Sequence, residues 1–318
     1  MRKFLVVALL GLSAAAPAKK LPTPSDVVAG APASAWRAIP ANDLVVMELA
    51  NGGRIVIQLA PDFAPVHVAN IRALAHGGYW DGASVYRVQD NYVAQWGQNE
   101  SEKPWPAGVT PKPPAEYTRS LKGLRIRPLG SPDPYAAGAG FSGGWPVAYS
   151  SKGGWADLVH CYGSVGVGRD LSPDTGTGGE LYAVIGQAPR QLDRNIAIVG
   201  RVIEGIDRLS ALPRGTGDLG FYKDKAQNVP IASLRLASDM PAAERPSYEY
   251  MDSVSPAFAS YLRVRANRHD SFYDHPAGGV DLCNVQVPVR RKPQATNALV
   301  RYVAKLAILV LDHGRPVV

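Results

Sequence analysis

The residues that could do chemistry lie in a short stretch that places one arginine and one glutamine among aromatic and aliphatic neighbours. Arg87 lies in the sequence YRV at residues 86–88, and Gln95 lies in YVAQWG at residues 92–97. If residues 92–97 form a strand, Val93, Gln95 and Gly97 share one of its faces. A guanidinium and a carboxamide beside an apolar surface can donate hydrogen bonds to a bound carbonyl or amide. Spacing alone leaves a second interpretation open, in which Arg87 only covers the end of a barrel in solvent.

The sequence contains no known motif of a metal, dithiol, serine-nucleophile or phosphate-binding site. The six histidines form no HExxH motif, and the chain contains no CxxC or GxSxG motif. His269 and His275, with the aspartates beside them, fit a solvated polar segment better than a metal site. The glycine-rich residues 176–179 lack the lysine of a phosphate loop. We therefore expect no metal and no cofactor.

Short apolar segments rich in β-branched residues must position these side chains, and they predict a closed antiparallel barrel. Residues 44–49 and 54–59 flank Asn51, Gly52 and Gly53, which supply the positive-φ positions of a hairpin turn. Further strands are expected at residues 84–88, 92–96, 164–167, 181–185, 196–202 and 231–236. The fold class is therefore mainly β.

Two helices are expected to cap this barrel. Pro65 suits a first helical turn, apolar residues recur every three positions at Val68, Ile71 and Leu74, and the glycines at 77–78 suit a helix end. A second, shorter helix is expected near residues 205–212. Residues 100–160, rich in proline and glycine, form a long insert that has either a function of its own or a small fold of its own.

The two ends of the chain differ from the barrel in composition. Arg2 and Lys3 precede an apolar run and a small-residue stretch, which predicts a signal peptide at residues 1–18. Residues 19–42 are rich in proline and alanine and are expected to be a flexible leader. The barrel domain is placed at residues 43–238, and residues 239–318 are expected to be a helical C-terminal extension in which Ser255 caps a helix.

Charge and hydropathy narrow the partners. The formal net charge is +7, but the basic residues are scattered, so no nucleic-acid site is indicated. Residues 298–311 are apolar but interrupted by charges, which favours a short packed or amphipathic helix over a membrane span. We expect an exported monomer, periplasmic or secreted, with no stable membrane span once the signal peptide is removed. The two cysteines, Cys161 and Cys283, form either one disulfide or two separate buried thiols.

Several segments together resemble the cyclophilin-type peptidyl-prolyl cis/trans isomerases. The segments are FAPVHVANI at residues 63–71, YRV at 86–88 with VAQWG at 93–97, GSVGVGR at 163–169, GGELY at 178–182, and VGRVIEG at 199–205. They occur in the family's order and cover roughly residues 44–236. The resemblance implies an eight-stranded antiparallel barrel capped by two helices, and binding of proline-containing segments of other proteins.

The resemblance also assigns roles to single residues. The catalytic arginine falls on Arg87 and the groove glutamine on Gln95. Gly168 falls where a backbone carbonyl and amide pair with the substrate. The remaining substrate-binding positions line the proline pocket: Tyr92, Val93, Tyr182, Leu192 and Ile196. Three positions depart from the family pattern, namely Gln191 for an indole, Ile196 for a histidine and Glu180 for a glutamine.

The resemblance supports three hypotheses. The first is an isomerase (EC 5.2.1.8) that assists the folding of exported proteins, with Arg87 stabilising the twisted prolyl amide. The second is a cyclophilin-like module that binds proline-containing segments with weak turnover, and the departures at Gln191, Ile196 and Glu180 motivate it. The third, a structural barrel without a ligand, leaves Arg87 and Gln95 without a role. We further expect the insert to lie on the groove side, with Trp105, Tyr135, Phe141 and Trp145 as anchors for clients.

Overall fold

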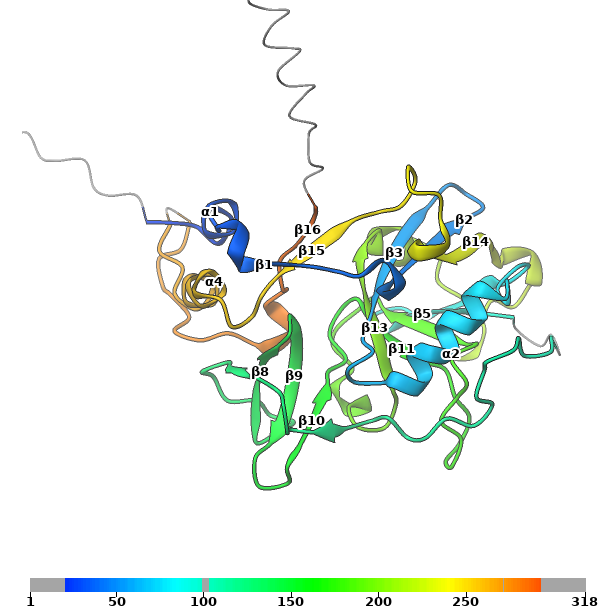
Figure 1. The fold of residues 1–318 in the computed structure, drawn as a ribbon, viewed down its shortest axis with the longest axis horizontal. Helices are drawn as coiled ribbons and strands as arrows, with labels where there is room; N and C mark the ends of the chain where they lie inside the picture. The colour runs from blue at the N-terminus through cyan, green and yellow to red at the C-terminus, as the bar shows by residue number, and fades with distance from the viewer. Residues whose placement is uncertain (1–20, 99–102, 271, 293–318) are drawn as a thin grey trace, which may run out of the picture.

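The computed structural model describes residues 21–98, 103–270 and 272–292. Eight antiparallel strands close into a barrel in the order β11-β12-β5-β4-β14-β2-β3-β13, which confirms the expected fold class (Figure 1). The strands of the barrel are β2 (Leu44–Leu49), β3 (Arg54–Leu59), β4 (Ser84–Val88), β5 (Val93–Gly97), β11 (Ser164–Val167), β12 (Leu181–Val184), β13 (Ile198–Glu204) and β14 (Val229–Leu236). The sequence predicted each of them to within a few residues.

The β2–β3 hairpin shows why the sequence pattern was readable. Gly52 has a φ of +85°, a conformation that glycine adopts without steric cost. The side chain of Asn51 accepts a hydrogen bond from the N–H of Gly53 at 3.0 Å, and this bond closes the turn. The register that follows pairs Met47 with Ile55 and Val45 with Ile57, so both strands present apolar side chains to the barrel interior.

Two helices cover the barrel. Helix α2 (Pro65–His76) buries Val68, Ile71 and Leu74 in the same cluster as the barrel strands, as the three-residue spacing predicted. Helix α3 (Ile206–Ser210) adds Leu209 to that cluster. The cluster is the main core, and its bulky members include the fully buried Trp80 and Trp96. The packing of this core fixes the positions of β4 and β5, the strands that carry Arg87 and Gln95.

The insert has a small fold of its own, which settles one of the two alternatives left by the sequence. Its residues form a five-stranded sheet in the order β6-β10-β9-β8-β7. The strands are β6 (Arg119–Ser120), β7 (Arg127–Pro128), β8 (Gly138–Ser142), β9 (Trp145–Ser150) and β10 (Trp155–Leu158). Trp145, Val147 and Leu158 of this sheet pack on Phe63 and Ile198 of the barrel side.

A second core joins three segments that are far apart in the sequence. Strand β1 (Trp36–Ala38) pairs with β15 (Tyr248–Met251), which pairs in turn with β16 (Val289–Arg291). Helices α1 (Pro24–Ala29) and α4 (Pro256–Ala266) contact each other beside the insert sheet, and the fully buried Phe141 and Phe258 meet in this core. We call residues 24–38, 119–158 and 248–291 the accessory unit. In Figure 1 its labelled helices and insert strands lie on one side of the molecule, opposite α2 and the barrel strands.

The prediction of a flexible leader at residues 19–42 is wrong where the structure describes it. Thr23 and Asp26 form a capping box at the start of α1, and Trp36 of β1 is buried. The leader shows no period because its helix and strand are very short and because the partner of β1 lies more than two hundred residues later. In the C-terminal extension, Ser255 caps α4 as predicted, accepting a hydrogen bond from the N–H of Phe258, but strands β15 and β16 were missed.

Two predictions lie outside the described residues: the signal peptide at residues 1–18 and the apolar segment at residues 298–311. Within the described ranges, no helix is both long and apolar enough to cross a bilayer.

Candidate functional site

Arg87 and Gln95 lie opposite each other on neighbouring strands. The register of β4 and β5 pairs the two residues directly, just after a β-bulge between Val85 and Arg87. A bulge turns the side chains that follow it, and such irregularities occur next to active sites. Nη1 of Arg87 donates a hydrogen bond to Oε1 of Gln95 at 2.9 Å. The structure therefore brings together the two residues that the sequence put forward as catalytic.

The guanidinium of Arg87 is held from several directions. Nε donates to the carbonyl oxygen of Leu219 at 2.7 Å, and Nη2 donates to the side chain of Gln89. The guanidinium carbon lies 5.3 Å from the ring centre of Phe221 and 5.9 Å from that of Tyr92, within the range of cation–π attraction. Burial lowers the pKa of Arg87 below its ordinary value, against a raising effect of neighbouring tyrosines.

The loop that carries Leu219 and Phe221 was not found from the sequence. Leu219 has a φ of +54°, unusual for a leucine, and this conformation is part of the turn that presents its carbonyl to Arg87. Phe221 forms an isolated β-bridge with Arg87 and stacks on Tyr86 at 5.9 Å between ring centres. Glycines at 215, 217 and 220 mark a turn in the sequence, but nothing in that pattern reveals which strand the turn contacts.

Glu180, which stands where the family pattern has a glutamine, is part of a hydrogen-bonded chain. The hydroxyl of Tyr86 donates to the carboxylate of Glu180, and the backbone N–H of Gln98 donates to the same carboxylate at 2.9 Å. Nε2 of Gln95 donates to the hydroxyl of Tyr86 at 2.6 Å. Because the amide nitrogen of Gln95 is used in this way, its oxygen faces Arg87. Glu180 therefore helps fix the orientation of Gln95. Burial and the negative charge of Glu180 raise the pKa of Tyr86, so its hydroxyl keeps its proton.

An apolar cluster lies beside this polar pair. Val93, Tyr182 and Val184 are buried together, with Tyr92 and Ile196 packed against them, and Tyr182 lies opposite Gln95 on the neighbouring strand β12. Four of the five expected pocket residues thus meet. The fifth, Leu192, lies partly exposed in the short turn of residues 190–192 and is not a member of this cluster. Gly168 lies close to Gln95, and its N–H donates to the carbonyl of Glu180 at 2.8 Å.

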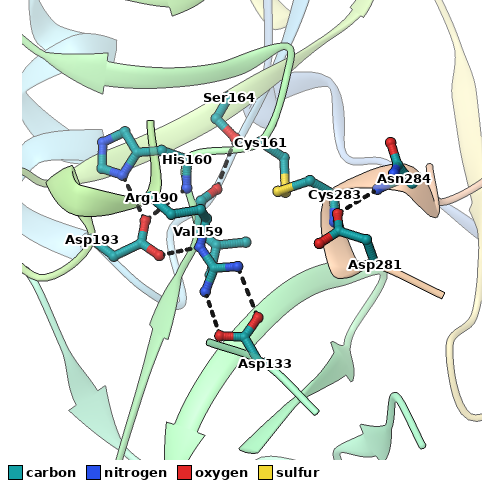
Figure 2. The surroundings of a disulfide bond; sticks show 10 residues. All are labelled: Asp133, Val159, His160, Cys161, Ser164, Arg190, Asp193, Asp281, Cys283 and Asn284. Carbon is teal, nitrogen blue, oxygen red and sulfur yellow. Dashed lines mark hydrogen bonds and ion pairs between the residues drawn. A yellow bond between two sulfur atoms is a disulfide. The ribbon is translucent and has the colours of Figure 1, made fainter. Parts of the chain in front are cut away.

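Behind the apolar cluster, Tyr182 contacts a buried polar network whose members His160, Asp193 and Arg190 are drawn in Figure 2. The hydroxyl of Tyr182 and Nε2 of His160 are 2.9 Å apart, and Nδ1 of His160 is 2.9 Å from Oδ1 of Asp193. An ionised Asp193 can only accept, so Nδ1 carries the proton and Nε2 accepts the hydrogen bond from Tyr182. His160 is fully buried and Tyr182 is 5% exposed.

An aspartate, a histidine and a hydroxyl in a row are also the parts of a hydrolytic triad. Here, however, the hydroxyl belongs to a buried tyrosine, and burial raises the pKa of Tyr182 well above its ordinary value. That hydroxyl lies in the interior against His160, where a substrate carbonyl does not reach it. The row fixes the ring of Tyr182 in place.

This network continues into the accessory unit. Nε of Arg190 donates to the carboxylate of Asp193, while the two terminal nitrogens of Arg190 donate to Asp133 of the insert at 2.9 and 3.1 Å. The guanidinium of Arg190 also lies 4.8 Å from the ring centre of the exposed Tyr135. Buried arginines are ordinarily paired in this way, because an unpaired charge is costly in the interior.

Cys161, the residue after His160, is disulfide-bonded to Cys283, with Cα atoms 4.9 Å apart (Figure 2). The pairing alternative of the sequence analysis is confirmed. The bond links the barrel side of the chain to the accessory unit across 122 residues. Closing a loop of that length stabilises the folded state by about 3–5 kcal/mol in the chain-entropy account.

Comparison with known proteins decides the family. The family described as "Cyclophilin type peptidyl-prolyl cis-trans isomerase/CLD" matches residues 44–236, more than half of the chain. The chain belongs to the cyclophilin family. This family membership, with its named relatives, supports peptidyl-prolyl isomerase activity.

Similar proteins are named as peptidyl-prolyl cis-trans isomerases or as cyclophilins. This cyclophilin is 24% identical over 187 residues to a probable peptidyl-prolyl cis-trans isomerase of Brucella suis, a match that covers 59% of this chain and 79% of the relative. It is 41% identical over 49 residues to peptidyl-prolyl cis-trans isomerase B of Bacillus subtilis, covering 15% and 34% of the two chains. The crystal structure of the cyclophilin AquaCyp293 from Hirschia baltica is similar in fold, with a TM-score of 0.64 and 23% identity, and the match covers 85% of this chain and 97% of that one.

The insert of this cyclophilin does not present all four expected client anchors. Phe141 is fully buried against Phe258, and Trp145 is 8% exposed under Arg201, so both are core residues and that part of the expectation is wrong. Trp105 stacks on Tyr79 beside α2, and only Tyr135 approaches the turn of residues 190–192. Aromatic residues in a proline-rich stretch did not reveal which of them would build a core.

Proposed function

We propose that this cyclophilin isomerises Xaa-Pro bonds in exported proteins and that Arg87 is its catalytic residue. The observation that carries the proposal is the fixation of Arg87 beside the cluster of Val93 and Tyr182. Three of the five N–H donors of its guanidinium go to Gln95, Gln89 and the Leu219 carbonyl. One N–H remains on each terminal nitrogen, and these two donors are the ones that a bound peptide would receive.

Isomerisation makes and breaks no covalent bond, and it passes through no covalent intermediate. Rotation about the Xaa-Pro bond crosses a barrier of about 20 kcal/mol because amide resonance is lost in the twisted state. In that state the prolyl nitrogen becomes basic and the carbonyl oxygen is no longer conjugated with it. An enzyme that binds the twisted state better than either planar isomer lowers the barrier.

Arg87 suits this task because its charge does not depend on pH in the working range. Its two remaining donors can reach the prolyl nitrogen and the neighbouring carbonyl, while the prolyl ring packs on Val93, Tyr182, Tyr92 and Ile196. A preorganised donor of this kind contributes about 3 kcal/mol to transition-state stabilisation. Because the N–H of Gly168 is already used, we assign its carbonyl oxygen, rather than its amide, to the peptide backbone.

Export is the part of the proposal that concerns location. The signal-peptide pattern at residues 1–18 supports it, as does the Cys161–Cys283 bond, because disulfides persist in oxidising compartments such as the periplasm. Clients would then be unfolded or partly folded proteins that expose proline-containing segments in that compartment.

A second function is a binding module with weak turnover, and the departures at Gln191 and Ile196 favour it. Gln191 is exposed and Ile196 is only partly buried beside the pocket cluster. One experiment separates the two functions: exchange between cis and trans isomers of a short Xaa-Pro peptide, measured by NMR with the full mature chain. Accelerated exchange supports the isomerase. Peptide binding without acceleration would establish the binding module in its place.

A further inference from the structure

A cavity of about 450 Å³ lies where the barrel meets the accessory unit. Arg201 and Val202 of β13 line it from the barrel, and Trp145, Val285 and Val287 line it from the other side. Cavities of roughly 300–1,000 Å³ are the size that holds small-molecule ligands. Arg87 is not part of its lining, so this cavity is separate from the proposed isomerase site.

Arg201 is the only cation among the described residues that line the cavity, and its guanidinium contacts only neutral groups. Nε and Nη2 donate to Oε1 of Gln58 at 3.1 and 2.8 Å, and Nη1 donates to the carbonyl of Gly144 at 2.8 Å. Its guanidinium carbon lies 4.6 Å from the ring centre of Trp145. Within the part of the chain that the structure describes, no carboxylate forms an ion pair with Arg201.

Arg190 provides the comparison within the same molecule. Arg190, which is 4% exposed, also lies against the insert and meets two carboxylates, those of Asp133 and Asp193, whereas Arg201 is partly buried. Even partial burial of a guanidinium without a counter-charge costs free energy, because neutral acceptors and a ring face replace only part of its hydration. Desolvation accordingly lowers the pKa of Arg201 to about 10. A ligand that brings one negative charge to Arg201 would offset that cost.

The rest of the lining defines the other end of the ligand. Aliphatic side chains, among them Leu158, Val202, Val285 and Val287, form one part of it, and polar side chains such as Ser164 and Gln286 form another. Glu204 also borders the cavity, but its carboxylate is already engaged by Arg291 and by the hydroxyl of Tyr248. A single cation among aliphatic side chains suits one carboxylate on an apolar chain, whereas a doubly charged phosphate would require further donors.

We infer that this cavity is a binding site for an apolar monocarboxylate, whose carboxylate pairs with Arg201 and whose hydrocarbon chain lies against the aliphatic wall. After the bonds to Gln58 and Gly144, one N–H remains on each terminal nitrogen of Arg201, and these two donors are the ones that the carboxylate would accept. The site does not depend on the isomerase activity, and its failure would leave the function proposed for Arg87 unchanged.

Octanoate is the probe for this site, and octan-1-ol, which has the same chain without the charge, is its control. Calorimetric titration of the full mature chain should show saturable one-to-one binding of octanoate and at least about tenfold weaker binding of octan-1-ol, as expected for the loss of a charge-assisted hydrogen bond. Arg201→Met should weaken octanoate binding by about the same factor and leave the affinity for octan-1-ol nearly unchanged.

Val287→Phe is the second variant, because it fills the cavity from the opposite wall and leaves Arg201 in place. It should abolish octanoate binding. Isomerisation of a short Xaa-Pro peptide reports whether each variant is folded and should remain at the wild-type rate. Equal affinity for octanoate and octan-1-ol, no binding of octanoate to the wild-type chain, or unaltered octanoate binding in Val287→Phe would each overturn the inference.

Discussion

The hydroxyl of Tyr182 lies 2.9 Å from Nε2 of a histidine, His160, that solvent does not reach. This contact joins a residue of the proposed proline pocket to the segment that ends in the disulfide. The ring of Tyr182 is therefore positioned from behind, by a group that never touches the substrate. His160 is a positioning residue in this arrangement.

Tyr182→Phe should weaken peptide binding while it leaves most of the turnover in place. The change keeps the ring but leaves Nε2 of His160 buried without its donor, at a cost of about 1–3 kcal/mol in unfolding free energy. We expect a several-fold rise in KM and little change in kcat, because the ring contacts ground and transition states alike.

Tyr261→Phe is the matched control for Tyr182→Phe. Its hydroxyl donates to the carbonyl of Gln286 at 2.9 Å inside the accessory unit. It should lower stability to a similar extent without changing KM. Identical KM values for the wild type and both variants would contradict a positioning role for His160.

Arg87→Ala should reduce the isomerisation rate of a short Xaa-Pro peptide by about a hundredfold, the loss expected for one preorganised transition-state donor. Arg87→Lys should recover little, because an ammonium group keeps the charge but not the planar donors that now meet Gln95, Gln89 and Leu219. Arg208→Ala, which removes an exposed arginine of α3, is the control and should behave as wild type. A rate for Arg87→Ala within threefold of the wild type would remove Arg87 from the mechanism.

Asp157→Asn should stabilise the protein, and more so at pH 8 than at pH 5. Asp157 is 2% exposed, and neither of its oxygens has a hydrogen-bond partner among the described residues. Burial, together with the charge of Asp193, raises the pKa of Asp157 from 3.8 to about 8. Between these two values the unfolded chain has released the proton and the folded chain has kept it, so stability falls as the pH rises.

The slope of that fall is about 1.4 kcal/mol per pH unit for one full proton, and partial coupling reduces it. Below pH 4 the wild type and Asp157→Asn should be almost equally stable. Chemical unfolding of both proteins at several pH values measures the difference. A stability difference that does not change between pH 4 and pH 8 would show that Asp157 is ionised in the folded state.

Replacing both cysteines, Cys161 and Cys283, by serine should lower the free energy of unfolding by about 3–5 kcal/mol. Denaturant unfolding of the double variant, beside the oxidised and the reduced wild type, measures this loss. The reduced wild type should match the double variant. If all three proteins unfold at the same denaturant concentration, the bond does not restrict the unfolded chain to the extent that its loop of 122 residues implies.

The barrel could be predicted from the sequence because local patterns specify its elements. Alternating apolar residues, the turn at Asn51 and the helix spacing of Val68, Ile71 and Leu74 each specify an element without reference to distant residues. The pairing of Arg87 with Gln95 also follows from two strands that are neighbours in the chain.

What the sequence did not reveal depends on contacts between distant segments. Trp36 stands in a leader with no visible period, and its strand forms only because β15 supplies the hydrogen bonds. Phe221 reaches Arg87 through a bridge between residues more than a hundred positions apart. His160 has no neighbour in sequence that suggests either Asp193 or Tyr182, so the network behind the pocket is visible only in the folded chain.

The accessory unit consists of segments from the start, the middle and the end of the chain. Its parts must therefore assemble in a certain order. During synthesis the last barrel strand is complete at Leu236, and the barrel can close at that stage. Strand β1 has no hydrogen-bonding partner until residues 248–251 have been made, and that sheet is finished only when Arg291 has been added. The N-terminal segment must therefore wait until the barrel strands have been made, so the isomerase barrel and the unit beside it acquire their structure at different moments in the life of one chain.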